Sequence, residues 1–361
     1  MKELEYIPKI IRASLDHDER ALRLLSVNLM RRIKNENPEI ASEIGKALDL
    51  NAIGASAKRG VGISASPIDK ENRLDLLDIE EPFKIKRPIF ESDTNKFIDD
   101  FIKEREKVNE LLDEGLFPTS SIILSGPPGV GKTYLARYLA GELNIKFATL
   151  NLAAAVSSYL GKTGQNLKSV LDFAKKEPTI LLLDEFDSIA KKRDDNSELG
   201  ELKRIVNVLL KELEDWPYHS VVIAATNYPE LLDRAIWRRF DIALKIDLPD
   251  KKQRIEIIQR ALSHKLEKVN FDILETLGEL TDGMSADDIC KIIERARKIS
   301  ILNDENLVQS IFRILIKFNG NSNINFNKRI CIELKNNTKL SISKIAEIIG
   351  KSKSTVQYYL K

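Results

Sequence analysis

Apolar residues recur at helical spacing through the first fifty residues of the chain, from Ile7 to Leu48. Residues three and four positions apart share one face of a helix, so this pattern predicts a small helical domain over residues 1–50. The next segment, residues 51–84, lacks sustained periodicity, and its first half is rich in Gly, Ala and Ser. Such composition is typical of a linker.

A different pattern begins near residue 121, where short, wholly apolar runs alternate with amphipathic segments. The runs are SIILS, IKFATLN, TILLLD, SVVIAATN and IALKID. Strands buried on both faces and separated by helices predict a parallel sheet with crossover helices, and we expect an α/β domain over residues 85–250. Residues 251–318 show only helical periodicity. An Asn-rich break opens the last segment, residues 319–361, which ends in a further helical unit.

The segment GPPGVGKT fits the phosphate-loop pattern GxxxxGK[ST] and lies between a predicted strand and a predicted helix. Glycines let the backbone N–H groups point at phosphate oxygens, together with the helix N-terminus. We expect Lys132 to neutralise the β and γ phosphates of ATP and Thr133 to ligate Mg²⁺. The residues expected to contact the nucleotide are Gly126, Pro127, Pro128, Gly129, Val130, Gly131, Lys132, Thr133 and Tyr134.

Polar residues follow two of the predicted strands. Asp184 and Glu185 end the run ILLLDE, and Asn227 ends AATN. Ligands of open parallel sheets gather at the carboxyl ends of the strands. We therefore expect Asp184 to hold the Mg²⁺ shell, Glu185 to act as the general base on a water, and Asn227 to position that water.

Two arginines, Arg238 and Arg239, close the next predicted helix. They could simply complement the C-terminal dipole of that helix. Alternatively, they stabilise transition-state charge, because the phosphate loop itself contains no arginine and a guanidinium meets phosphate oxygens bidentately. A donor of this kind could act on the nucleotide of another subunit.

Taken together, the segments GPPGVGKT, LLLDEFDSIA and AATNYPELLDRAIWRRFD resemble the AAA family of ATPases over roughly residues 85–318. This resemblance implies the P-loop AAA+ fold, a five-stranded parallel sheet with a helical lid over residues 251–318. It implies a ring-forming homo-oligomer, usually a hexamer. It also implies that Asp184 and Glu185 are the Walker B pair, that Asn227 is sensor 1, and that Arg238 and Arg239 are arginine fingers.

The segment SSYLGKTGQN follows the second predicted strand of the α/β domain. Family members that thread polypeptide carry an aromatic-aliphatic-Gly pore loop at this place, and Tyr159, Leu160 and Gly161 match it. An aromatic ring can grip substrate side chains through apolar area without reading sequence. Alternatively, Tyr159 packs under its own loop. Lys162 departs from the family pattern, which commonly has Glu there.

Two further segments refine the resemblance. GMSADDIC, in the expected lid, resembles the motif that approaches the nucleotide, but it has no arginine at the sensor 2 position. The N-terminal helices resemble the leading domain of a group of bacterial AAA ATPases often encoded beside a subtilisin-like serine protease. This implies a protease partner for the chain.

The last helical unit, SISKIAEIIGKSKSTVQYYLK, has the form of a helix-turn-helix, with Ala346 at the crossing and Gly350 at the turn. Its spacing resembles homeodomain-like and resolvase-type units. That resemblance implies DNA binding through residues 340–361. An amphipathic tail that caps the lid or docks a protein partner remains the alternative. The residues expected to contact DNA are Lys351, Ser352, Lys353, Ser354, Thr355 and Gln357.

Composition limits the setting in which the chain works. Its 361 residues contain no run near the ~18 consecutive apolar residues of a membrane span, so we expect no membrane partner and a cytoplasmic location. Two cysteines and three histidines disfavour a disulfide scaffold and a zinc site. The net charge of +2 hides an imbalance, because residues 319–361 carry eight basic and two acidic residues.

Three functions fit these observations. We favour an ATP-hydrolysing ring that remodels or threads a protein substrate. The alternative is a DNA-associated AAA ATPase, a loader or regulator, anchored by its C-terminal helix-turn-helix. A scaffold that binds ATP without cycling is disfavoured, because all the expected catalytic residues are present.

Overall fold

The computed structural model describes residues 77–150, 170–190, 209–213, 216–320 and 323–361, and four isolated positions, 8, 29, 40 and 168. Most of the expected helical domain and linker, and the expected pore-loop residues Tyr159, Leu160 and Gly161, lie outside the described residues. The chain divides into two compact units, residues 1–65 and 66–361. Everything below concerns the second unit.

A six-stranded sheet forms the centre of the α/β domain, in the order β1-β3-β4-β5-β2-β6. Five strands, from β3 to β6 in that order, run parallel to their neighbours, and β1 pairs with β3 antiparallel. The five parallel strands confirm the fold that the sequence resemblance implied. The strands are β1 (Leu77–Glu80), β2 (Ser121–Ser125), β3 (Lys146–Leu150), β4 (Thr179–Leu183), β5 (Val221–Thr226) and β6 (Ile242–Lys245).

The sixth strand, β1, falls within the segment expected to be linker. Leu77 is buried and pairs with Leu150, so this strand extends the sheet at its edge. Its sequence LDIE contains two acidic residues and no apolar run, so sequence periodicity gave no signal for it. The chain then passes along helix α6 (Lys132–Leu143), where a Cβ on Gly141 would collide with the carbonyl oxygen of Phe83.

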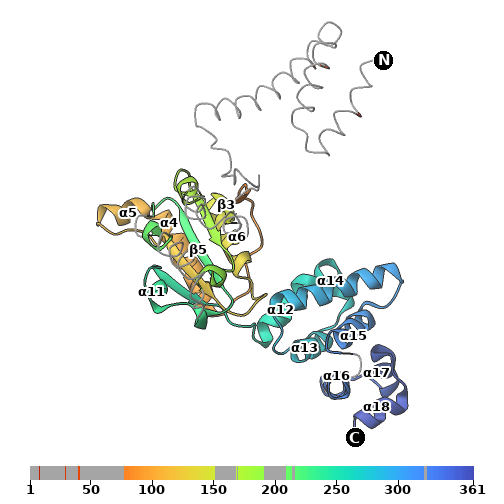
Figure 1. Cartoon of the computed structure of the whole chain (residues 1–361). Helices are drawn as coiled ribbons and strands as arrows, with labels where there is room; N and C mark the ends of the chain where they lie inside the picture. Colours follow the sequence, from red (N-terminus) through yellow and green to blue (C-terminus); the bar gives the residue numbers. More distant parts are fainter. Residues whose placement is uncertain are drawn as a thin grey trace, which may run out of the picture. The chain divides into compact units, whose positions relative to one another are not determined.

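Helices cover both faces of the sheet because the strand residues alternate between two cores. Ile122 and Leu124 of β2 pack with α4 (Ser92–Glu106) and α6 (Lys132–Leu143), which lie together against the sheet in Figure 1. Ile123 of the same strand packs on the other face, with the described parts of the intervening helices and with α11 (Arg234–Trp237). The result is a three-layer domain.

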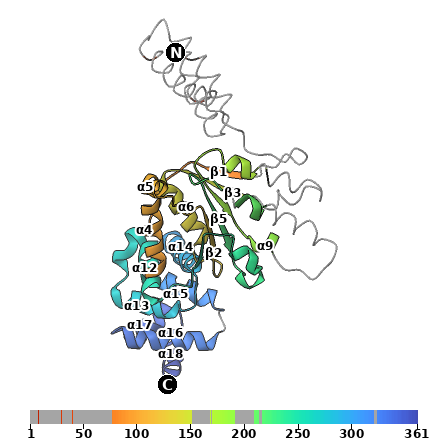
Figure 2. The same cartoon turned by 90° about the vertical axis from the view of Figure 1, so that its left-hand side faces the viewer.

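The remaining described helices lie beside the sheet or form the lid and the tail, which are coloured cyan to blue in Figures 1 and 2. The α-helices are α5 (Val108–Asp113), α9 (Asp187–Ala190), α12 (Lys251–Leu262), α13 (Phe271–Leu280), α14 (Ala286–Leu302), α15 (Leu307–Phe318), α16 (Ile324–Asn337), α17 (Ile342–Ile349) and α18 (Lys353–Tyr359). Two short 3₁₀ helices, η1 (Pro229–Leu231) and η2 (Ser263–Lys268), complete the set.

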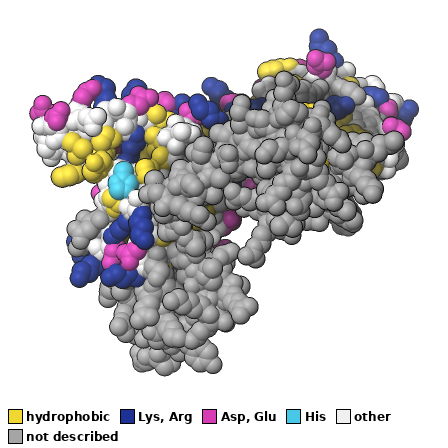
Figure 3. Space-filling view, turned by 90° about the horizontal axis from the view of Figure 1, so that it is seen from above, with side chains coloured by type: hydrophobic (Ala, Val, Ile, Leu, Met, Phe, Trp, Pro, Cys, Tyr) yellow, Lys and Arg dark blue, Asp and Glu magenta, His cyan; other side chains and the backbone are white. Residues whose placement is uncertain are grey.

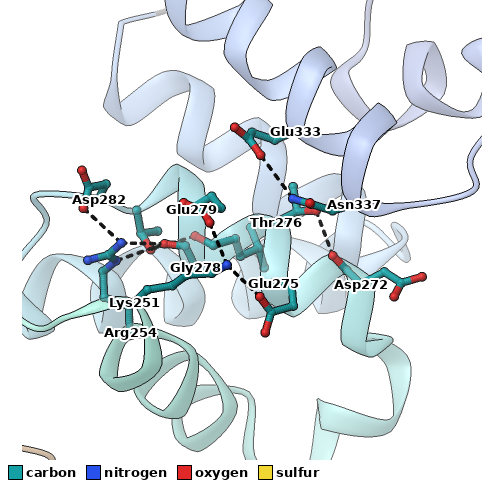
Figure 4. Close-up of polar contacts among 12 residues, drawn as sticks. Lys251, Arg254, Asp272, Glu275, Thr276, Gly278, Glu279, Asp282, Glu333 and Asn337 are labelled. Carbon is teal, nitrogen blue, oxygen red and sulfur yellow. Dashed lines mark hydrogen bonds and ion pairs between the residues drawn. The ribbon is translucent and has the colours of Figure 1, made fainter.

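Polar contacts lock the first two lid helices together (Figure 4). The buried guanidinium of Arg254 on α12 donates to the carbonyl oxygen of Gly278 on α13 through Nε (3.1 Å) and Nη2 (2.9 Å). Beside it, Lys251 pairs with Glu275 at 2.8 Å and with Glu279 at 2.7 Å. Because a charge buried without partners is costly, these bonds favour one arrangement of α12 on α13.

In the part of the chain that the structure describes, no helix combines the length and apolar character needed to cross a bilayer.

Candidate active site

The phosphate-loop sequence connects β2 to α6 and owes its shape to its glycines. Gly126 has φ +149°, and a Cβ at this position would collide with the carbonyl oxygen of Ile246. Gly131, at φ +107°, is the N-cap of α6 in left-handed conformation. Only glycine adopts these backbone angles readily. The loop can therefore turn sharply, so that its backbone and the N-terminus of α6 face the space that the loop encloses.

Lys132, the first residue of α6, is buried, at 7 % exposure. Its Nζ donates hydrogen bonds to the carbonyl oxygens of Gly126 (2.7 Å) and Pro127 (2.9 Å) and to Oδ1 of Asn227 (2.7 Å). Burial lowers the pKa of Lys132, and the nearby carboxylate of Asp184 acts in the opposite direction. The three acceptors of the ammonium are neutral oxygens, and a negatively charged phosphate oxygen can replace them.

Thr133 and Asp184 lie in contact beside this lysine, since Thr133 Oγ1 donates to Asp184 Oδ2 at 3.0 Å. One hydroxyl and one carboxylate suit Mg²⁺, which takes few protein ligands and fills its shell with phosphate and water. Glu185 follows at the end of β4, exposed and in left-handed backbone conformation, with φ +51°. Non-glycine residues seldom adopt this conformation, and when they do it is often at functional sites.

Asp187 links the ends of β4 and β5 and was missed by the sequence reasoning. Its Oδ1 accepts from Thr226 Oγ1 at 2.8 Å and from the Asn227 backbone N–H at 3.4 Å. The Phe186 N–H adds a 2.9 Å bond to the carbonyl oxygen of Ala225. These bonds fix the end of β5 against the end of β4. The sequence signal that could have pointed to Asp187 is its place as the third acidic residue of the run DEFD, after Asp184 and Glu185.

A cavity of about 620 Å³ extends from these residues to the lid. That volume is within the range of small-molecule sites. The phosphate loop, the ends of β4 and β5, the segment before α4, and helices α12 and α14 all contribute residues to its lining. The lining residues are Pro88, Ile89, Phe90, Pro128, Gly129, Val130, Gly131, Lys132, Thr133, Tyr134, Asp184, Glu185, Asn227, Ile257, Arg260, Ala261, Ala286, Asp287, Cys290 and Glu294.

Two side chains hold the segment before α4 in place as a wall of this cavity. Tyr134 Oη donates to the carbonyl oxygen of Lys86 at 2.8 Å, and Arg260 of α12 donates to that of Arg87. The guanidinium of Arg87 is itself paired with Asp99 of α4 at 2.7 Å. Arg260 was missed because its contact spans 173 positions of sequence, and an arginine on an amphipathic helix carries no distinguishing pattern.

The N-terminus of α14 docks directly on the phosphate loop. The Asp287 N–H donates to the carbonyl oxygen of Gly129 at 3.1 Å. A Cβ on Gly129, which has φ +77°, would lie 2.5 Å from Ser285 Oγ. The GMSADDIC segment therefore reaches the loop and lines the cavity through Ala286, Asp287 and Cys290, without an arginine at that place.

Arg238 and Arg239 are exposed at the end of α11 and are absent from the described lining of the cavity. Arg239 instead lines a separate hollow with Phe117, Tyr218 and Asp241. The Asp241 carboxylate anchors this segment, because its Oδ2 accepts from the backbone N–H groups of Ser120 (2.8 Å) and Ser121 (2.9 Å).

The other residues predicted from sequence lie as follows. Gly126 and Pro127 contact Lys132 and are not among the cavity-lining residues, whereas Pro128 through Tyr134 line it. The six residues predicted to contact DNA lie around the turn between α17 and α18, outside the described lining of the cavity. They are Lys351, Ser352, Lys353, Ser354, Thr355 and Gln357.

Comparison with known proteins places these features in context. Residues 122–248 match the family model described as "ATPase family associated with various cellular activities (AAA)". An uncharacterised AAA family ATPase of Sinorhizobium fredii is 36 % identical over 242 residues, which cover 66 % of this chain and 72 % of that protein. A proteasome-activating nucleotidase of Pyrococcus abyssi is 34 % identical over 220 residues, 57 % of this chain and 55 % of the relative.

A solved structure shares the fold. The crystal structure of the FIGL-1 AAA domain superposes with a TM-score of 0.56 at 21 % sequence identity. The match covers 76 % of this chain and 97 % of the other.

Proposed function

The chain belongs to the AAA family of ATPases and hydrolyses ATP, and from that premise we propose that it works as a ring that remodels protein substrates. The observation that carries the catalytic part is a convergence of side chains at one end of the cavity. Lys132 contacts Asn227 there, and Thr133 contacts Asp184. Three separate segments of sequence thus meet where the phosphates of a nucleotide would lie against the N-terminus of α6.

We assign each of these residues a role in turnover. Lys132 exchanges its neutral acceptors for β- and γ-phosphate oxygens, and Thr133 and Asp184 hold Mg²⁺, which neutralises phosphate charge when bound. Glu185 is the general base, and Asn227 orients the attacking water. Support for Glu185 comes from its exposed carboxylate at the cavity and its strained backbone.

A homo-oligomeric ring, expected to be a hexamer, would complete this site. Arg239 lies in a hollow with Phe117, which is 80 % exposed, and Tyr218, which is 46 % exposed. From above, hydrophobic side chains gather around a histidine at one side of the molecule (Figure 3). Exposed aromatic side chains beside an arginine are typical of protein interfaces, so we assign this face to the neighbouring subunit. Arg238 or Arg239 would then act on the neighbour's ATP.

A protein is the substrate that we favour. One relative is named a proteasome-activating nucleotidase, and the segment SYLG of this chain matches a polypeptide-gripping pore loop. Tyr159, Leu160 and Gly161 lie outside the described residues, so this part of the proposal rests on sequence. The proposed protease partner rests on the resemblance of the N-terminal helices alone.

Two variants of the full chain test the proposal against wild type, with a fluorescent protein carrying an unstructured peptide tail as substrate. Glu185→Gln should bind ATP and lose turnover, since the amide cannot accept the water proton. Tyr159→Ala should hydrolyse ATP at the wild-type rate and lose ATP-dependent unfolding of the substrate. Phe271→Ala, which removes an exposed aromatic from the lid, serves as the matched control and should retain both activities.

Two results would contradict the proposal. Undiminished phosphate release by Glu185→Gln would show that this carboxylate is not the base. Equal unfolding rates for Tyr159→Ala and wild type would show that the tyrosine does not grip substrate.

A further inference from the structure

The C-terminal tail, residues 323–361, is built into the hydrophobic core of the lid. Helix α16 packs against α13 and helix α17 against α15, and α18 packs on α16 and α17 (Figures 1 and 2). Ile330, Ile349 and Val356, one from each tail helix, belong to the same buried cluster as Ile257 of α12 and Phe312 of α15. Because packed cores resist continuous deformation, a force on the tail is passed to the lid.

The exposed side of the tail is basic and rich in hydrogen-bond donors. No acidic residue occurs after Glu347, whereas Lys351, Lys353 and Lys361 are all exposed. Tyr358 is 64 % exposed, and its ring lies 5.1 Å from Lys328 Nζ of α16. We call this region the tail surface, and it comprises Lys328, Lys351, Ser352, Lys353, Ser354, Gln357, Tyr358 and Lys361.

The two acidic residues of the tail are occupied elsewhere. Glu347 Oε1 accepts from Lys344 Nζ and from Gln309 Nε2, both at 2.8 Å. Glu333 Oε2 accepts from Asn337 Nδ2 at 3.2 Å on α16 (Figure 4). The positive charge of the tail surface is therefore available to an outside polyanion.

We propose that the tail surface binds the backbone and major groove of duplex DNA, and that this binding changes ATP turnover through the shared core of tail and lid. Lys351 and Lys353 at the start of α18 and Lys361 after its end suit phosphates on both sides of a groove. A helix with its side chains is about 10–12 Å wide and enters a major groove about 12 Å wide. Hydroxyl and amide side chains on α18 suit base edges, whereas a membrane surface would call for a broad apolar face.

The effect on turnover follows from where the lid meets the nucleotide. Arg260 of α12 and Asp287 of α14 line the cavity, and both helices share the buried cluster with the tail. A ligand that binds one lid position better than another shifts the lid toward that position. This second half of the proposal depends on the site proposed above being the ATPase site, while DNA binding does not.

Fluorescence anisotropy of the full chain on a labelled 30-base-pair duplex, across a salt series, tests the binding. The tail variant carries Lys351→Gln, Lys353→Gln and Lys361→Gln together. The matched control carries Lys252→Gln, Lys298→Gln and Lys317→Gln, three exposed lid lysines outside the tail surface. Each lost phosphate contact should make the negative slope of log K against log salt shallower by about 0.9. The slope of the tail variant should therefore be shallower than that of wild type by about 2.7, and the slope of the control should be unchanged.

ATP hydrolysis is measured on the same three proteins with and without saturating duplex. We expect DNA to change the wild-type and control rates at least twofold and to leave the tail variant at its DNA-free rate. Binding without salt dependence, or equal binding by the tail variant and wild type, overturns the DNA site. Equally tight binding of polyglutamate or of anionic vesicles also overturns it. If the wild-type protein hydrolyses ATP without DNA and its rate does not change when DNA is bound, the coupling is overturned. The proposed ATPase site is unaffected by that result.

Discussion

The ammonium of Lys132 and the side-chain oxygen of Asn227 lie 2.7 Å apart, although 95 positions separate them in sequence. The hydrogen bond joins the first turn of α6 to the end of β5. It gives a buried cation a neutral partner, and both residues line the cavity. Asp187 also accepts from the Asn227 backbone N–H at 3.4 Å, so Asn227 is held by a second bond when Lys132 turns to phosphate, as a preorganised group requires.

Asn227→Ala should therefore impair hydrolysis more than binding. Lys132 keeps two of its three acceptors, so the Kd for ATP should change by less than about threefold, while kcat falls about 100-fold, as expected for a lost orienting group. Single-turnover hydrolysis and binding of a fluorescent ATP analogue measure the two quantities. Asn270→Ala, which removes only a lid helix cap, should leave kcat unchanged. A large rise in Kd at constant kcat would contradict an orienting role.

Thr226→Val tests the link between Asp187 and the end of β5. Thr226 is fully buried, and without its hydroxyl the Asp187 carboxylate loses its 2.8 Å donor. We expect a loss of about 1–3 kcal/mol in the free energy of unfolding, measured in urea, together with a lower kcat. Thr276→Val is the matched control, since that threonine is equally buried and donates to the carbonyl oxygen of Asp272 at 2.8 Å (Figure 4).

The control separates stability from positioning. If Thr276→Val lowers kcat as much as Thr226→Val does, the loss of activity follows from lost stability, and Asp187 has no special part in placing Asn227.

The side chains proposed to meet the phosphates could be grouped from sequence for a physical reason. Polar residues that directly follow buried strands must meet at one edge of a parallel sheet, so Asp184 and Asn227 could be placed without knowing the strand order. The loop from Gly126 to Thr133 is equally local, because its function depends on backbone conformation that its own glycines allow. The family, the parallel sheet and the helical lid were confirmed on this basis.

The part of the cavity wall formed by the lid and by the segment before α4 could not be predicted from sequence, because it is made by contacts between distant segments. Arg260 reaches Arg87 across 173 positions, and neither residue stands in a pattern that predicts a contact. Strand β1 was missed for a related reason, since a four-residue edge strand with two acidic residues resembles a loop. The packing of the tail into the lid core was foreseen only as the alternative of a tail that caps the lid, because it depends on tertiary contacts that helical periodicity cannot specify.

Gly129→Ala should weaken ATP binding by displacing α14 from the phosphate loop. The added Cβ would lie 2.5 Å from Ser285 Oγ, so the loop, the helix or both must shift. Gly115→Ala is the matched control, because Gly115 has nearly the same φ, +74° against +77°, with nothing within 4 Å of its Cβ. Both variants should lose about 1–2 kcal/mol of stability from the left-handed backbone. Only Gly129→Ala should raise the Kd for ATP, by about tenfold or more, and equal Kd values in the two variants would show that the docking does not matter for binding.

Arg260→Met should raise the Kd for ATP and spare the chemical step. Arg260 lines the cavity, and its guanidinium donates to the backbone of Arg87, which leads into the wall formed by residues 88–90. Methionine keeps much of the apolar length and loses the charge and all donors. A hydrogen bond from a charged group is worth about 1.5–3 kcal/mol, so the Kd should rise at least tenfold while kcat at saturating ATP stays within about twofold.

Arg313→Met provides the comparison for Arg260→Met, because Arg313 is an exposed arginine on α15 that pairs with Glu305, which precedes that helix. Exposed ion pairs contribute little, so this variant should match wild type in both Kd and kcat. A fall in kcat for Arg260→Met with unchanged Kd would mean that the guanidinium acts on the reacting phosphate. In that case α12, and not the segment GMSADDIC of α14, would supply the lid arginine that this chain lacks at the sensor 2 position.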